Sequence, residues 1–104
     1  MFEGTNATAI DIVPLNPVCE GHRIVIPRAH VKDFMDDPAE TASVMEYAAE
    51  RAEELVKQHG YAGMNLITSA GKEATQSVFH LHVHLVPRRK NDGLKLPWTN
   101  QKKS

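Results

Sequence analysis

The chain has 104 residues, enough for one domain around a single hydrophobic core and too few for two. Hydrophobic residues make up 41% and charged residues 24%, with a formal net charge of −1, which is typical of a soluble globular protein and excludes general affinity for nucleic acid. Cys19 is the only cysteine, so no internal disulfide can form. Because no apolar run is long enough for a signal peptide or a membrane span, we expect a cytoplasmic protein without a membrane partner.

The first third of the chain predicts two strands. Residues 1–8 are small and polar, and we expect them to be loose. Residues 9–13 are predicted to form a strand that ends at a turn containing Pro14 and Pro17. Residues 21–27 are predicted to form a second strand, and the consecutive apolar side chains at its centre indicate that both faces are covered.

A long helix is predicted to follow. Asp36 and Asp37 supply an acidic cap, and Pro38 suits the first turn. The helix should run to His59, because Gly60 suits the left-handed residue just beyond a helix end. Apolar residues spaced three and four apart predict a buried stripe that consists of Met45, Ala48, Ala49, Ala52, Leu55 and Val56.

The last part of the chain places histidines at every second position. Residues 61–68 predict a third strand, and residues 69–75 predict the loop that turns back into Q-S-V-F-H-L-H-V-H-L-V-P-R-R, residues 76–89. We predict that this last segment is a strand that Pro87 ends. Side chains alternate between the faces of a strand, so the three histidines should share one face, opposite an apolar one.

Such a row of histidines could bind a metal or an anion. At about 3.3 Å per residue the outer two Cα atoms are about 13 Å apart, too far for one zinc ion unless the strand bends strongly. A phosphate fits better, since the central His82 can attack phosphorus while its neighbours donate hydrogen bonds to the oxygens. A metal site on His82, His84 and His22 is one alternative, and a histidine-rich surface strand without a function is another.

The pattern H-L-H-V-H-L-V after Q-S-V-F resembles the signature of the histidine triad (HIT) superfamily of nucleotide hydrolases and transferases. The likeness extends upstream over residues 11–30 and covers most of the chain. It implies an α+β fold with an antiparallel sheet of four to five strands, one long helix on one face, and a shortened N-terminal hairpin. We expect a single such domain over residues 1–104, with residues 91–104 as a C-terminal tail.

By this resemblance His82 is the nucleophile that attacks the α-phosphorus of a purine nucleotide derivative and forms a covalent nucleotidyl-histidine. The substrate would be a nucleoside phosphoramidate or a dinucleoside polyphosphate, and no metal or other cofactor is required. The resemblance implies three groups of further site residues, which are the histidines His80, His84 and His22, the phosphate and leaving-group contacts Gln76, Ser77 and Ser69, and the nucleoside contacts Asp11 and Ile12.

Two positions depart from the family pattern. Many HIT proteins have Asn where this chain has Ser69, and Gly where it has Thr75. Serine donates one hydrogen bond where asparagine donates two, and threonine restricts a loop that glycine leaves free. A non-catalytic nucleotide-binding protein on the same scaffold is therefore a further alternative.

A sheet of this size leaves an edge and an uncovered surface, so we expect a homodimer, as the resemblance also implies. Trp98 is predicted to pack either on its own core or near the active site of the partner. Lys102 and Lys103 are predicted to lie in a solvated tail.

Overall fold

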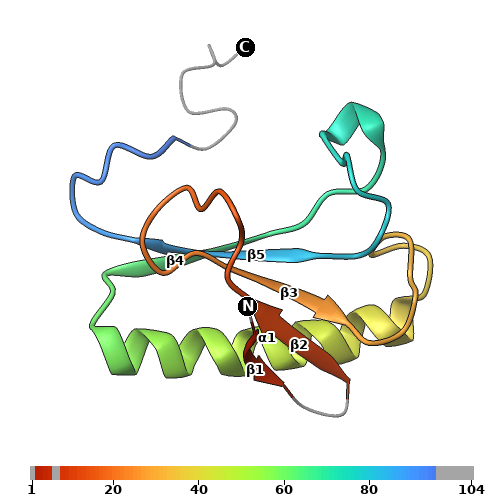
Figure 1. Cartoon of the computed structure of the whole chain (residues 1–104), viewed down its shortest axis with the longest axis horizontal. Coiled ribbons are helices and arrows are strands. Elements are labelled where there is room, and N and C mark those ends of the chain that lie inside the picture. The colour runs from red at the N-terminus through yellow and green to blue at the C-terminus, as the bar shows by residue number, and fades with distance from the viewer. Residues whose placement is uncertain (1, 6–7, 96–104) are drawn as a thin grey trace.

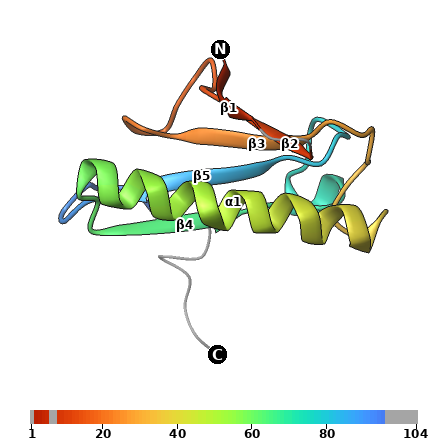
Figure 2. The same cartoon turned by 90° about the horizontal axis from the view of Figure 1, so that it is seen from below.

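The computed structural model describes residues 2–5 and 8–95 and shows an α+β fold (Figure 1). Its five strands form one antiparallel sheet in the order β1-β2-β3-β5-β4. Figure 2 shows α1 running along one face of this sheet, which confirms the predicted fold class. The elements are β1 (Phe2–Thr5), β2 (Ala9–Ile12), β3 (Arg23–Pro27), α1 (Pro38–His59), β4 (Gly63–Ile67), the 3-10 helix η1 (Lys72–Ala74) and β5 (Val83–Arg88).

The helix α1 begins and ends as its capping residues predict. The Asp37 carboxylate accepts a hydrogen bond from the Glu40 N–H at 3.1 Å, which satisfies one of the free donors of the first turn. Gly60 adopts a left-handed conformation with φ of 69°, and its N–H donates to the Val56 carbonyl at 2.7 Å. None of the helices in the described ranges is long and apolar enough to cross a membrane.

The buried face of α1 differs in part from the prediction. Ala48 and Leu55 are buried as expected, but Ala49 is exposed, and the buried set also includes Val44 and Tyr47. Val44, Ala48 and Leu55 follow one helical stripe at spacings of four and seven, and Ala49 lies just outside it. A small residue such as alanine leaves the edge of a stripe ambiguous in the sequence.

The helix covers the face of the sheet that carries Val25, Val83 and Leu85, and these side chains form the core together with Val44 and Leu55. Residues alternate along β5, so His84 points to the opposite face. The sheet thus separates an apolar side under α1 from a side that carries histidine.

Residues 2–5 form a strand, so the prediction of a loose N-terminus was wrong for them. β1 pairs antiparallel with β2 in a short hairpin, with an irregularity in register between Phe2 and Gly4. Four residues containing a glycine show no clear period in the sequence, and their strand is established by pairing with β2.

The strand β5 begins later in the chain than predicted and continues past the residue predicted to end it. It begins at Val83, so His80 and His82 precede it in an extended segment. Buried and half-buried side chains still alternate from His80 to Leu85. Pro87 lies within β5 and does not end it, because β3 pairs with β5 only as far as Leu85 and leaves proline a strand neighbour on one side alone.

Thr75 occupies the left-handed region of backbone conformation, with φ of 72° and ψ of 17°. For a non-glycine residue this conformation costs about 1–2 kcal/mol. We expect Thr75→Gly to stabilise the fold by about 0.5–1 kcal/mol, since relief of strain exceeds the added entropy of the unfolded chain. Urea unfolding measures the change. Thr75→Ala keeps the steric cost and should give no comparable gain; equal gains in both variants would contradict this explanation.

Candidate active site

The sheet register places His84 beside apolar side chains on the face that α1 leaves uncovered. Ile12 of β2 is paired with Ile24 of β3, Ile24 is paired with His84, and His84 is paired with Ile67 of β4. Directly opposite residues in an antiparallel sheet point to the same side. Ile12, a predicted nucleoside contact, therefore lies on the same face as His84, two strands away.

His82 is held by a backbone carbonyl. Its Nδ1 lies 2.8 Å from the His80 carbonyl oxygen, which can only accept, so Nδ1 carries the proton of the neutral ring. The Thr68 hydroxyl donates to the His82 carbonyl at 2.7 Å and fixes the backbone at this residue. The remaining ring nitrogen, Nε2, then has a free lone pair, which is the form that a nucleophile needs.

His22 and His84 form a hydrogen-bonded pair. His22 Nε2 lies 2.9 Å from His84 Nδ1, and the His82 and His84 ring centroids are 5.2 Å apart. Burial, with smaller contributions from His22 and His82, lowers the pKa of His84 to about 4. Burial and the charge of Arg23 also lower the pKa of His22. Both rings are therefore neutral at pH 7.

His80 contacts His82 through its backbone carbonyl, whereas its ring lies against another histidine. The ring packs edge-on against His30 at 5.3 Å between centroids. Its Nε2 is buried and has no hydrogen-bond partner among the residues that the structure describes. The structure thus brings together His22, His82 and His84, and links His80 to them through the backbone.

A pocket of about 280 Å³ adjoins the His22–His84 pair on the same face of the sheet. Its walls are mostly apolar, which suits the uncharged part of a small molecule. The lining residues are Val18, His22, Asn65, Ile67, His84, Val86, Arg88, Leu94 and Lys95.

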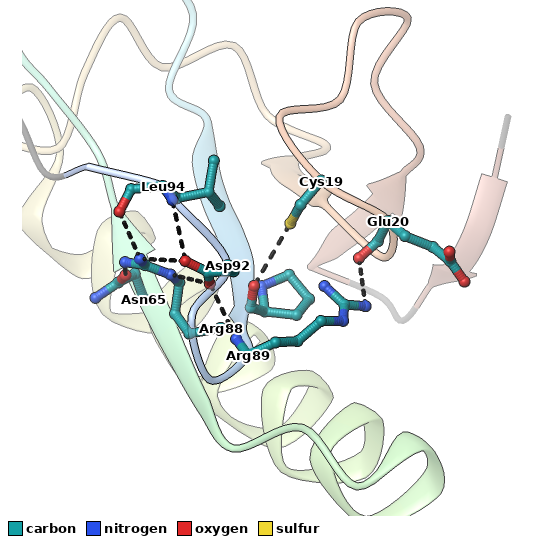
Figure 3. Close-up of polar contacts among 8 residues, drawn as sticks. Cys19, Glu20, Asn65, Arg88, Arg89, Asp92 and Leu94 are labelled. Atoms are coloured by element: carbon teal, nitrogen blue, oxygen red, sulfur yellow. Dashed lines mark hydrogen bonds and ion pairs between the residues drawn. The ribbon is translucent and has the colours of Figure 1, made fainter.

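The guanidinium of Arg88 in this pocket is already occupied. Figure 3 shows it bonded to both carboxylate oxygens of Asp92, at 2.9 and 3.0 Å, and to Asn65 and the Leu94 carbonyl, each at 2.8 Å. A turn follows β5, in which the Asp92 N–H donates to the Arg89 carbonyl at 3.2 Å. Arg88 therefore shapes the pocket. Lys95, which also lines it, forms no ion pair with the residues that the structure describes.

Asp11 lies away from the histidines. Its side chain is fully buried, shares the helix-covered face with its pairing partner Val25, and accepts hydrogen bonds from the Tyr47 hydroxyl and from Arg51 Nε at 3.1 Å. Both carboxylate oxygens are thus used inside the protein. This placement departs from the expectation that Asp11 contacts a ribose, and gives it a structural role.

Gln76 departs from its expected role in a similar way. Its side chain is only 4% exposed; Oε1 accepts from the Gly71 N–H at 2.7 Å, and Nε2 donates to the Lys32 and Val78 carbonyls at 2.8 and 3.2 Å. Gln76 therefore joins residues 68–82 to the loop before α1 and is not free to contact a leaving group. Of the other two predicted contacts, Ser69 is half-buried and Ser77 is exposed.

We expect Gln76→Glu to destabilise the fold by about 2 kcal/mol at pH 7. The carboxylate can still accept from Gly71 but cannot donate to the two carbonyls, and unmet buried partners cost about 1–3 kcal/mol. Thermal unfolding at pH 7 measures this. Glu73→Gln, an exposed change in the same segment, is the matched control. A Gln76→Glu variant as stable as this control would show that the two carbonyl bonds contribute nothing.

Sequence reasoning missed several residues that the structure brings to the site. Thr68 and the Val18 N–H, which donates to His22 Nδ1 at 3.1 Å, act through the backbone and leave no mark in residue type. Tyr47 and Arg51, which sequence reasoning also missed, lie outside the site: they are four residues apart on α1 and bind the buried Asp11, a pattern that is visible only once the sheet face is known.

Two further predictions concern a metal ion and the C-terminal residues. Within residues 2–5 and 8–95, no three or more His, Cys, Asp and Glu side chains form a group that could hold a metal ion, and His22, His82 and His84 of the metal alternative do not form one. Trp98, Lys102 and Lys103 lie outside the described residues.

Residues 4–91 match the model of the HIT domain family. Among curated relatives, an uncharacterized HIT-like protein of Methanocaldococcus jannaschii is 32% identical over 76% of this chain and 61% of its own length. A HIT-like protein of Chlamydia pneumoniae is 36% identical over 86% of this chain and 80% of its own. Adenylylsulfatase HINT3 of Arabidopsis thaliana is 31% identical over 80% of this chain and 43% of its own. The chain spans about three fifths of the length of several such relatives.

Solved structures agree with these relatives. A zinc-bound histidine triad family protein from Mycobacterium smegmatis has a TM-score of 0.80 and is 34% identical, over 91% of this chain and 70% of that one. A HIT family hydrolase from Clostridium thermocellum has a TM-score of 0.76 and is 28% identical, over 92% of this chain and 84% of that one. Because the family model matches residues 4–91, most of this chain, the chain belongs to the HIT family.

Proposed function

We propose that this protein is a nucleotide hydrolase or transferase that cleaves the α-phosphate linkage of a purine nucleotide derivative. The observation that carries the proposal is the bond from His82 Nδ1 to the His80 carbonyl, since it places the proton on Nδ1 and leaves the lone pair on Nε2 for attack. Membership of the HIT family supports nucleotide chemistry at the family level. Two similar proteins, an adenylylsulfatase and a HIT family hydrolase, have names that agree with hydrolysis.

In the proposed first step His82 Nε2 forms a bond to the α-phosphorus, and the bond from phosphorus to the leaving group breaks. The leaving group departs with the electron pair and takes up a proton. In the second step a water oxygen forms a bond to phosphorus and releases a proton, the phosphorus–nitrogen bond breaks, and His82 regains its lone pair. An alcohol or phosphate acceptor in place of water would make the same reaction a transfer.

The substrate would lie across β5 on the open face. Ile12 and Ile24 offer an apolar surface for the nucleoside on one side of His84, and the pocket adjoining His22 and His84 lies toward β4 on the other. Ser69 and Ser77 are the proposed contacts to the phosphate and leaving group. Asp11 is not part of this proposal, so ribose hydroxyls would be bound by other groups.

Turnover of a fluorogenic AMP phosphoramidate tests the proposal. We expect release of the fluorescent amine, and rapid quenching followed by mass spectrometry should show one nucleotidyl group bound to His82. AMP binding without release of the amine would instead indicate a non-catalytic nucleotide-binding protein. Release of the amine without any covalent species, even under single-turnover conditions, would support direct attack by water.

We also propose that the protein works as a homodimer in the cytoplasm. β4 is an edge strand of the sheet, and Leu66 on it is 41% exposed. A strand edge that none of the described strands pairs with invites pairing with another strand. Sedimentation equilibrium measures the association, and a monomer at every concentration tested would refute it.

A further inference from the structure

A chain of hydrogen bonds runs from the backbone to His84. The Val18 N–H lies 3.1 Å from His22 Nδ1, and His22 Nε2 lies 2.9 Å from His84 Nδ1. A backbone N–H can only donate, so His22 Nδ1 must be the unprotonated nitrogen of a neutral ring. His22 then carries its proton on Nε2 and donates it to His84 Nδ1, which leaves the proton of His84 on Nε2.

The opposite arrangement is disfavoured by the same geometry. If His84 donated from Nδ1, His22 Nε2 would be the acceptor and its proton would move to Nδ1. That proton would then face the Val18 N–H across 3.1 Å, with two donors and no acceptor between them. A doubly protonated His22 has the same conflict, and burial of both rings opposes it further.

We infer that the backbone N–H of Val18 is a positioning group that sets the tautomer of His84 through His22. It makes His84 Nε2 a fixed, uncharged hydrogen-bond donor, while the His80 carbonyl makes His82 Nε2 an acceptor. The two neighbouring rings thus present opposite hydrogen-bonding characters from their Nε2 atoms. This inference rests on the proposed function only in what the donor is for: a hydrogen bond to a phosphate or leaving-group oxygen beside the attacked phosphorus.

The loop that carries Val18, residues 13–22, is fastened to the end of β5. Cys19 Sγ donates to the Pro87 carbonyl at 3.4 Å. Figure 3 shows Arg89 reaching the Glu20 carbonyl, to which its Nη2 donates at 2.8 Å. Arg89 also lies over the ring of Tyr61, 4.8 Å from its centroid. Because Cys19 and Glu20 directly follow Val18, these anchors hold its N–H in position relative to the histidines.

Gly21 completes this loop and brings the backbone to His22. Its φ of 90° lies in the region that favours glycine. A Cβ at this position would come 2.3 Å from the Tyr61 hydroxyl oxygen and 3.2 Å from Pro87 Cγ. The close approach of the loop to β5 is thus built into the sequence just before His22.

Nitrogen-15 spectra of the histidine rings in the wild-type full chain test the inference directly. At pH 7 we expect His22 and His84 to be neutral with the proton on Nε2, and His82 to carry it on Nδ1. This measurement needs neither substrate nor turnover, so it separates the inference from the proposed function. A His84 ring protonated on Nδ1 would overturn it.

Removing the donor is the second test. Val18→Pro deletes the N–H, and Leu15→Pro is its matched control, because Leu15 also follows a proline and is 93% exposed. We expect His84 to become a mixture of tautomers in Val18→Pro alone, with kcat on the phosphoramidate about tenfold lower and KM changed less. Val18→Ala, which keeps the N–H, should keep the single tautomer. A single Nε2–H tautomer of His84 in folded Val18→Pro would refute the role of Val18.

A pair of variants at His22 gives the same answer if proline prevents folding. His22→Gln can accept from Val18 through its amide oxygen and donate to His84 through its amide nitrogen, whereas His22→Phe can do neither. We expect Gln to preserve the Nε2–H tautomer of His84 and Phe to lose it. Equal tautomer populations in the two variants would overturn the inference.

Discussion

His82→Asn is expected to lower kcat on an AMP phosphoramidate by about 10⁴-fold or more, while AMP binds with nearly unchanged affinity. The substitution removes the attacking nitrogen and keeps a polar side chain, so the pocket beside His22 and His84 stays intact. Loss of a nucleophile in other covalent enzymes has effects of this order or larger. Single-turnover kinetics measure the loss, and isothermal titration calorimetry measures the binding of AMP.

His59→Asn is the matched control for this variant, because His59 is exposed at the end of α1, outside the cluster. It should turn over the substrate like the parent. Wild-type turnover by folded His82→Asn would refute covalent catalysis by His82. If His82→Asn lost both AMP binding and turnover, His82 would hold the ligand instead of attacking it.

Arg51→Met is expected to lower the free energy of unfolding by about 3–5 kcal/mol at pH 7. Arg51 donates to Asp11, whose carboxylate is fully buried between β2 and α1, and the variant leaves that charge with Tyr47 as its remaining partner. An uncompensated buried charge is costly even when one hydrogen bond survives. Urea unfolding at pH 7 measures the change.

Two further variants separate the buried charge from other effects of losing Arg51. The double variant Asp11→Leu/Arg51→Met removes the charge together with its partner and should recover much of the stability. Lys57→Met breaks an exposed pair with Glu53 on the same helix and should change stability by less than about 1 kcal/mol. A double variant as unstable as Arg51→Met would show that packing of Arg51, and not the charge of Asp11, accounts for the loss.

The sequence predicted the features that local rules control. Asp37 and Gly60 marked the ends of α1 because caps act within one helical turn. The alternation around His82 and His84 predicted which side chains share a face, since the period of an extended chain is local as well.

Features that depend on distant neighbours were harder to predict. β5 begins at Val83, the first residue of its segment that pairs with β3, although β3 itself continues to Pro27, and no residue near His80 reveals this. Asp11 and Ile12 are neighbours in β2, so their side chains point to opposite faces of the sheet and one of them had to face α1. The sequence does not say which face the helix covers. Gln76 was expected at the phosphate because of its position near the histidines. Its side chain instead forms three hydrogen bonds to backbone groups, those of Gly71, Lys32 and Val78.

Two main-chain groups orient these histidine rings: the His80 carbonyl binds the ring of His82, and the Val18 N–H binds the ring of His22. Every amino acid carries a carbonyl, and every one except proline carries an N–H. Genetic drift at positions 18 and 80 can therefore change the side chain and leave these contacts in place. In a saturation mutagenesis library, position 18 should accept many residues but select strongly against proline, a pattern that a side-chain ligand would never produce.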